Sequence, residues 1–217
     1  LHGWLDNAAT FDRLVPILIS NLMGHHSTKL KQNLDTVDVV AIDLPGHGKS
    51  SHKSLDGASA ILADFVYYVY DVLYQLGWKD HDVILIGHSM GASISLMYAA
   101  AFPVSTMVLL DSLGPRPEAP TKVTKRLEKH IRTRLKGKPP SSIYPNIETA
   151  KETRCLTAKS FPGNQYISVE TATSLVKRGS VSEPDGTKIQ FLHDQRLKWP
   201  SILYFTTEQL HQLYRDV

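Results

Sequence analysis

Apolar positions along the first half of the chain follow two different periods. Short β-branched runs at 37–44, 82–86 and 105–110 predict buried strands. Residues 7–23, 59–76 and 90–102 carry apolar side chains three and four positions apart, which predicts helices. The resulting order of strand, helix, strand, helix, strand predicts a parallel sheet with right-handed crossovers and helices on both faces.

The pattern changes after Asp111, where Pro-rich and basic segments replace the alternation of strands and helices. We expect an α/β core over residues 1–111 and a helical lid over residues 112–217. Within the lid, the spacing of apolar residues predicts four helices, at 121–135, 147–157, 168–177 and 206–214. Residues 24–36 form a polar, His-rich stretch that predicts a loop longer than such a connection needs, with no assigned function.

Both ends of the chain have the form of interrupted elements. Leu1-His2-Gly3-Trp4 resembles the end of a buried strand running into a loop. Tyr214 to Val217 lies within a predicted helix and carries no capping signal. We therefore expect a fragment that lacks the first and the last strands of its sheet.

Composition narrows the class of protein. The 217 residues are 42% hydrophobic and 21% charged, which is typical of a globular chain, and the formal charge of +3 does not favour a nucleic-acid role. No stretch reaches the roughly 18 apolar residues of a membrane span. Cys155 is the only cysteine, which excludes an intramolecular disulfide and metal sites with several thiolate ligands. This use of cysteine favours a reducing compartment, and we expect a cytoplasmic or peroxisomal location.

The strongest motif is Gly87-His88-Ser89-Met90-Gly91, placed between a predicted buried strand and a predicted helix of small residues. A nucleophile at such a corner has a strained backbone, so the residues two before and two after it must be almost free of side chain. Glycines occupy both positions. Ser89 is therefore the predicted nucleophile.

Attack on a carbonyl places negative charge on its oxygen, which backbone N–H groups must stabilise. The amide of Met90 directly follows the nucleophile and supplies one donor. The loop at His2-Gly3-Trp4 has the form that supplies the other, so Trp4 and Met90 form the predicted oxyanion hole.

Three segments together resemble the α/β-hydrolase fold superfamily: residues 2–7 (His-Gly-Trp-Leu-Asp-Asn), 43–50 (Asp-Leu-Pro-Gly-His-Gly-Lys-Ser) and 87–91. More narrowly, they are similar to the serine hydrolase-like proteins, and the segment from His193 to Pro200 extends the likeness into the lid. The resemblance implies a Ser nucleophile, a His base, an acidic partner, a helical lid and no cofactor or metal. Relatives that act as dehalogenases or epoxide hydrolases have Asp where this chain has Ser89, so acyl transfer to water is favoured.

The acid and the base of the expected triad are less well defined. Asp111 directly follows the strand at 105–110 and is a possible acid, but it could equally serve only to hydrogen-bond the turn toward Gly114. None of the ten histidines can be nominated as the base, because the resemblance places that residue after a last strand that is not readable here. We expect the catalytic histidine to lie outside this chain.

Two classes of function remain open. The first is a serine hydrolase that cleaves an ester or related acyl bond of a small molecule, with this chain inactive by itself for lack of the histidine. The alternative is a non-catalytic hydrolase-fold protein that binds a ligand. The basic segment from Lys122 to Lys136 favours a lid helix with solvated charges over a helix that binds a membrane surface or an acidic partner.

Overall fold

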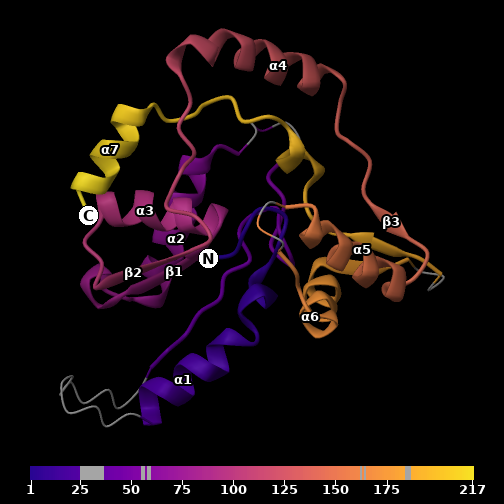
Figure 1. Cartoon of the computed structure of the whole chain (residues 1–217), viewed down its shortest axis with the longest axis horizontal. Coiled ribbons are helices and arrows are strands. Elements are labelled where there is room, and N and C mark those ends of the chain that lie inside the picture. Colours follow the sequence, from indigo (N-terminus) through magenta and orange to yellow (C-terminus); the bar gives the residue numbers. More distant parts are fainter. Residues whose placement is uncertain (25–36, 55–56, 58–59, 162, 164, 184–186) are drawn as a thin grey trace.

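The structure is a computed structural model that describes all residues except 25–36, 55–56, 58–59, 162, 164 and 184–186. Its centre is a parallel pair of strands, β1 (Ile84–His88) and β2 (Thr106–Leu110), joined by helix α3 (Met90–Ala101). Leu1 lies along the other edge of β1, where its carbonyl accepts a hydrogen bond of 2.9 Å from the amide of His88. The predicted parallel arrangement is confirmed (Figure 1).

Helices α2 (Leu62–Leu76) and α3 pack together and cover one face of this sheet. Leu44, Phe65, Val69, Leu85, Ile94 and Tyr98 are among the buried side chains of the resulting core. Helix α2 ends where predicted, because Gly77 adopts a left-handed conformation with φ of 68° and caps the helix with its amide. The short 3-10 helix η2 (Asp80–Asp82) then leads into β1.

Two expectations for the core were wrong in detail. Residues 37–44 do not form a strand, because the described residues offer them no ladder partner; the Leu44 amide instead donates to the Nε2 atom of His2 at 3.0 Å. The predicted first helix is divided into η1 (Ala8–Phe11) and α1 (Leu14–Gly24), and α1 extends away from the sheet (Figure 1). The face of the sheet opposite α2 and α3 therefore exposes Ile84 and Val108.

The second half contains the four predicted helices, α4 (Val123–Leu135), α5 (Ile147–Lys159), α6 (Val169–Gly179) and α7 (Thr207–Arg215), with 3-10 turns η3 (Pro120–Lys122) and η4 (Gln195–Lys198). It also contains a small antiparallel sheet in the order β3 (Ile143–Tyr144), β5 (Ile189–Phe191), β4 (Ser180–Ser182), which the sequence pattern did not predict. Strands of two or three residues are too short to show a period.

Helix α7 returns to the core, where Leu210 is buried and the Tyr214 hydroxyl donates to the Leu113 carbonyl at 2.6 Å. Helix α4 lies at the end of the molecule opposite α1 (Figure 1). Its buried residue is His130, which bonds to the Pro200 carbonyl at 2.8 Å, whereas the apolar Leu127 and Ile131 are exposed.

The division at residue 111 and the absence of a membrane-surface role both stay predictions. No helix in the described part of the chain combines the length and hydropathy needed to cross a bilayer.

Candidate active site

Ser89 occupies the corner between β1 and α3, and its backbone has a strained conformation that a constrained turn imposes. Its φ of 52° and ψ of −112° lie outside the regions that side chains favour, which costs about 1–3 kcal/mol. A Cβ atom added to Gly87 would lie 2.4 Å from the Gly91 carbonyl oxygen, and one added to Gly91 would lie 2.1 Å from the Leu1 carbonyl oxygen. Both motif glycines are thus required by the close approach of neighbouring backbone.

The nucleophile candidate opens into a cavity of about 590 Å³ that is lined by residues from both the predicted core and the predicted lid. Trp4, Met90 and Ser93 line the same cavity, and a Cβ placed on Gly3 would lie 3.4 Å from the Cβ of Ser89. Among the described residues, none forms a hydrogen bond with the Ser89 hydroxyl, whereas the Ser89 amide donates to the Leu110 carbonyl at 2.9 Å. The hydroxyl is therefore free to face a substrate.

The two residues of the predicted oxyanion hole, Trp4 and Met90, line the same cavity as Ser89. Met90 is the first residue of α3, and a helix has no internal acceptor for its first amides. Trp4 lies in the opening loop, and its amide donates to no group in the described residues. An amide that follows Ser89 at a helix N-terminus, together with a second amide from a residue of the same cavity, suits a developing oxyanion, and this role stays a prediction.

Asp111 lies beside β1 and β2 at the same sheet end, with a left-handed φ of 57°. Its carboxylate accepts a hydrogen bond from Gln165 at 3.3 Å and lies 3.9 Å from the Nε2 atom of His88. The turn toward Gly114 is held by the hydroxyl of Ser112, which donates to the Gly114 carbonyl at 3.1 Å. Both alternatives for Asp111, the acid of the triad and a residue that only holds this turn, stay predictions.

Two histidines near the site are His2 and His88. His2 is fully buried, accepts from the Leu44 amide through Nε2, and bonds to the Gly3 carbonyl through Nδ1 at 2.8 Å. Burial and the neighbouring His47 lower the pKa of His2 to about 3. His88 has its Nδ1 atom against Gly3. No described histidine contacts Ser89 through a hydrogen bond, and His25 and His26 lie outside the described residues.

A segment that we term the lid strap, residues 193–200, connects the second half of the chain to the first through hydrogen bonds. Its buried pair, Asp194 and Arg196, is joined by side-chain hydrogen bonds as short as 2.6 Å. Burial tends to raise the pKa of Asp194, but the hydrogen bonds from Arg196 outweigh it and lower that pKa. The Arg196 guanidinium also donates to the carbonyls of Lys53 and Ser54 at 2.5 and 2.7 Å.

The strap also contacts the loop that carries the predicted oxyanion hole. The indole nitrogen of Trp4 donates to the Leu197 carbonyl at 3.0 Å, and the Asp194 amide donates to the Gly46 carbonyl at 2.7 Å. Sequence reasoning noted residues 193–200 only by resemblance and missed this function. The available signal was an Asp and an Arg separated by one residue, because two such side chains can form strong charge-assisted hydrogen bonds with each other.

The described residues contain no cluster of three or more His, Cys, Asp or Glu side chains that could hold a metal ion. The structure therefore gives no geometric support for a metal centre at Ser89. The chemistry that the site supports is nucleophilic attack by a hydroxyl beside backbone N–H donors.

Comparison with known proteins identifies the class. The sequence profile described as "Alpha/beta hydrolase family" matches residues 1–203, and the chain belongs to this family. A serine hydrolase-like protein of Danio rerio is 33% identical over 98% of this chain and 60% of its own length, and a probable serine hydrolase of Drosophila melanogaster is 30% identical over 100% and 60%. The chain thus spans about 60% of the length of these curated relatives.

Solved structures agree with this assignment. A hypothetical protein of Pseudomonas aeruginosa PAO1 is 33% identical, with a TM-score of 0.80 over 100% of this chain and 68% of that chain. A thioesterase domain from the curacin biosynthetic pathway, at 21% identity and a TM-score of 0.69, covers 99% of this chain and 78% of its own and shows the same fold. Among the curated relatives, and not among the solved structures, monoglyceride lipase of Mus musculus is 34% identical over 45% of this chain and 34% of its own length.

Proposed function

We propose that the protein is a serine hydrolase that cleaves an ester or related acyl bond of a small molecule with Ser89 as nucleophile. The main observation that supports this proposal is the strained Ser89 backbone at the end of β1, which holds a free hydroxyl at the wall of a 590 Å³ cavity. Strain of this kind persists only where the surrounding structure enforces it, and it concentrates at functional sites. Cys155 is a free thiol, in keeping with a cytoplasmic or peroxisomal protein.

In the proposed reaction, the Ser89 oxygen bonds to the acyl carbon while a histidine outside residues 1–217 takes the hydroxyl proton. The carbonyl oxygen becomes an oxyanion that the Met90 and Trp4 amides stabilise. Collapse breaks the bond to the alcohol, which leaves with the proton from the histidine. Water then attacks the acyl-enzyme, with the histidine again as base, and releases the acid. Asp111 is the candidate partner of that histidine.

The family relationship supports this proposal, because the relatives are named as serine hydrolases or serine hydrolase-like proteins and one as a monoglyceride lipase. A second candidate is a non-catalytic ligand-binding protein. It is favoured by one observation, the lack of an imidazole bonded to the Ser89 hydroxyl in the described residues.

A fluorophosphonate probe, which reacts only with an activated serine, distinguishes the two functions. We would compare residues 1–217 with a form extended to the length of the relatives, each with Ser89→Ala. The serine hydrolase predicts rapid, Ser89-dependent labelling of the extended form, and labelling slower by roughly 10³-fold or more for residues 1–217 alone. Ser93→Ala, which changes another serine of the same cavity, is the matched control and should retain labelling. A folded extended form that does not label would favour the ligand-binding protein.

A further inference from the structure

The cavity beside Ser89 is lined by an excess of positive charge. Lys53, Arg116, Arg196 and Lys198 contribute cationic side chains, and the carboxylate among the lining residues is that of Asp194. Four cations and one carboxylate give this wall a net charge of +3, which equals the formal charge of the whole chain. A concave site lined by one sign of charge concentrates ligands of the opposite sign.

Two of these four cations already have acidic partners. Arg196 is paired with Asp194, as described above, and its guanidinium also ties down the backbone at Lys53 and Ser54. The Lys53 ammonium forms an ion pair of 2.7 Å with Asp64 at the start of α2. Neither is therefore available to a ligand without loss of a structural contact.

Lys198 and Arg116 differ in this respect. The Lys198 ammonium donates to the neutral amide oxygen of Gln195 at 2.7 Å and forms no ion pair within the described residues. Burial lowers the pKa of Lys198, which indicates that its charge lacks full solvation. Arg116 is exposed and has no ion-pair partner in the described part of the chain. Both cations line the Ser89 cavity.

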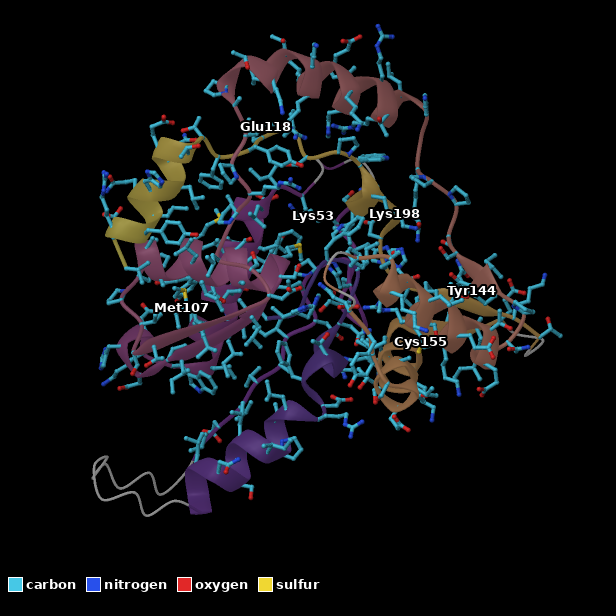
Figure 2. All side chains as sticks on the ribbon, in the orientation of Figure 1. Lys53, Met107, Glu118, Tyr144, Cys155 and Lys198 are labelled. Atoms are coloured by element: carbon cyan, nitrogen blue, oxygen red, sulfur yellow. The ribbon has the colours of Figure 1, made fainter. Side chains whose placement is uncertain are left out.

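The position of Lys198 is fixed before any ligand arrives. It ends η4 in the lid strap, whose Asp194–Arg196 pair and bond to Gly46 hold it on the core. Figure 2 labels Lys53 and Lys198, which lie in the region between the core and α4. A preorganised cation binds an anion with less loss of side-chain entropy than a free surface lysine does.

We infer that the substrate carries an anionic group, a carboxylate or a phosphate, which Lys198 and Arg116 bind inside the cavity while its acyl carbon faces Ser89. This inference rests on the proposed function, since it names the substrate class for the same site. Lysine binds such an anion as a point charge, and the arginine adds a planar donor pair that suits two oxygens of one group.

The test compares three p-nitrophenyl esters of similar length on the extended form of the protein: a neutral valerate, a glutarate monoester with a free carboxylate, and an analogue ending in a phosphonate. The variants are Lys198→Met and Arg116→Gln. Lys159→Met, which removes an exposed lysine at the end of α5 outside the cavity, is the control. The readout is the ratio of kcat/KM between each anionic ester and the neutral one.

We expect the unmodified protein to favour one of the anionic esters by about tenfold, and each variant to reduce that preference by about fivefold. The neutral ester should change less than about twofold, and Lys159→Met should change nothing. Comparison of the carboxylate and phosphonate esters shows which anion the site takes. Equal rates for charged and neutral esters, or equal losses on both in the variants, would overturn the inference.

A binding measurement separates this inference from the proposed function. The Ser89→Ala protein cannot turn over an ester, so its affinity for each of the three is read from the fluorescence of Trp4 and Trp199, which line the cavity. Tighter binding of an anionic ester, lost in Lys198→Met, supports the anion site even if no ester is hydrolysed. Turnover that depends on Ser89 but shows no anion preference supports the hydrolase alone.

Discussion

At the scale of single residues, Asp43 carries more contacts than its place in a predicted strand suggests. Its carboxylate accepts from the amides of Ala8 and Lys49 at 2.7 and 2.9 Å and from the Arg178 guanidinium at 3.0 Å. Burial tends to raise the pKa of Asp43, but the hydrogen bonds from Arg178 and the two amides outweigh it and lower that pKa. One side chain thus joins the first loop, the turn after residue 44 and helix α6 of the lid.

We predict that Asp43→Asn lowers the free energy of unfolding by about 2 kcal/mol at pH 7, since it removes charged acceptors from buried donors. The folded pKa lies below that of the unfolded chain, about 3.9. The stabilisation is therefore fully present above that value and is lost as pH falls through the folded pKa. Urea unfolding at several pH values should show the difference from wild type shrinking in acid. Asp38→Asn, at an exposed position, should leave stability within about 0.5 kcal/mol, and a pH-independent difference for Asp43→Asn would contradict the argument.

The residues of the nucleophile corner could be predicted from the sequence, whereas the residues that contact Asp43 could not. Gly87, Ser89 and Gly91 lie within five positions, and the steric rule that selects them is local. Asp43 and Arg178 are 135 positions apart, so their contact follows from the docking of α6 on the core and from no local pattern. The same reason explains why Lys198 and Arg116 were not recognised as cavity residues.

At the scale of elements, the lid strap depends on the planar guanidinium of Arg196. That group donates to both oxygens of Asp194 and to two backbone carbonyls, a geometry that a lysine cannot reproduce. We predict that Arg196→Lys costs about 2 kcal/mol and releases the strap from residues 53–54. Hydrogen exchange should rise in residues 193–200 and 43–54, while β1 stays protected.

Lys188→Arg, a conservative exchange at an exposed lysine, serves as the control and should leave exchange unchanged. The labelling rate of Ser89 in the extended protein adds a second readout, because Trp4 is held by the strap through Leu197. Unchanged exchange in the strap of Arg196→Lys would show that other contacts hold it.

Elements with a clear period were predicted to within a few residues, as for α2, α3, β1 and β2. Two kinds of element were not. The strands of the lid sheet are two or three residues long, and the segment 37–44 has the composition of a strand but no ladder partner among the described residues. Composition gives only a preference for a strand, whereas a strand itself requires backbone hydrogen bonds to a partner.

At the scale of the whole molecule, the described residues cover the sheet on one face only. Parallel sheets are normally buried on both faces, yet Ile84 is 55% exposed and Val108 is 38% exposed on the side opposite α2 and α3. The two strands also leave an edge at β2. An apolar face beside an open edge is a surface on which chains associate.

We therefore predict that residues 1–217, expressed alone, self-associate at micromolar concentration and bind the dye ANS. Ile84→Lys should reduce both effects, because it replaces an apolar side chain of the exposed face with a charge. Thr106→Lys, which alters the exposed residue paired with Ile84 without removing apolar surface, is the control and should reduce them less. Sedimentation velocity and dye fluorescence provide the readouts. A monomer that does not bind the dye would contradict the prediction that this face drives association.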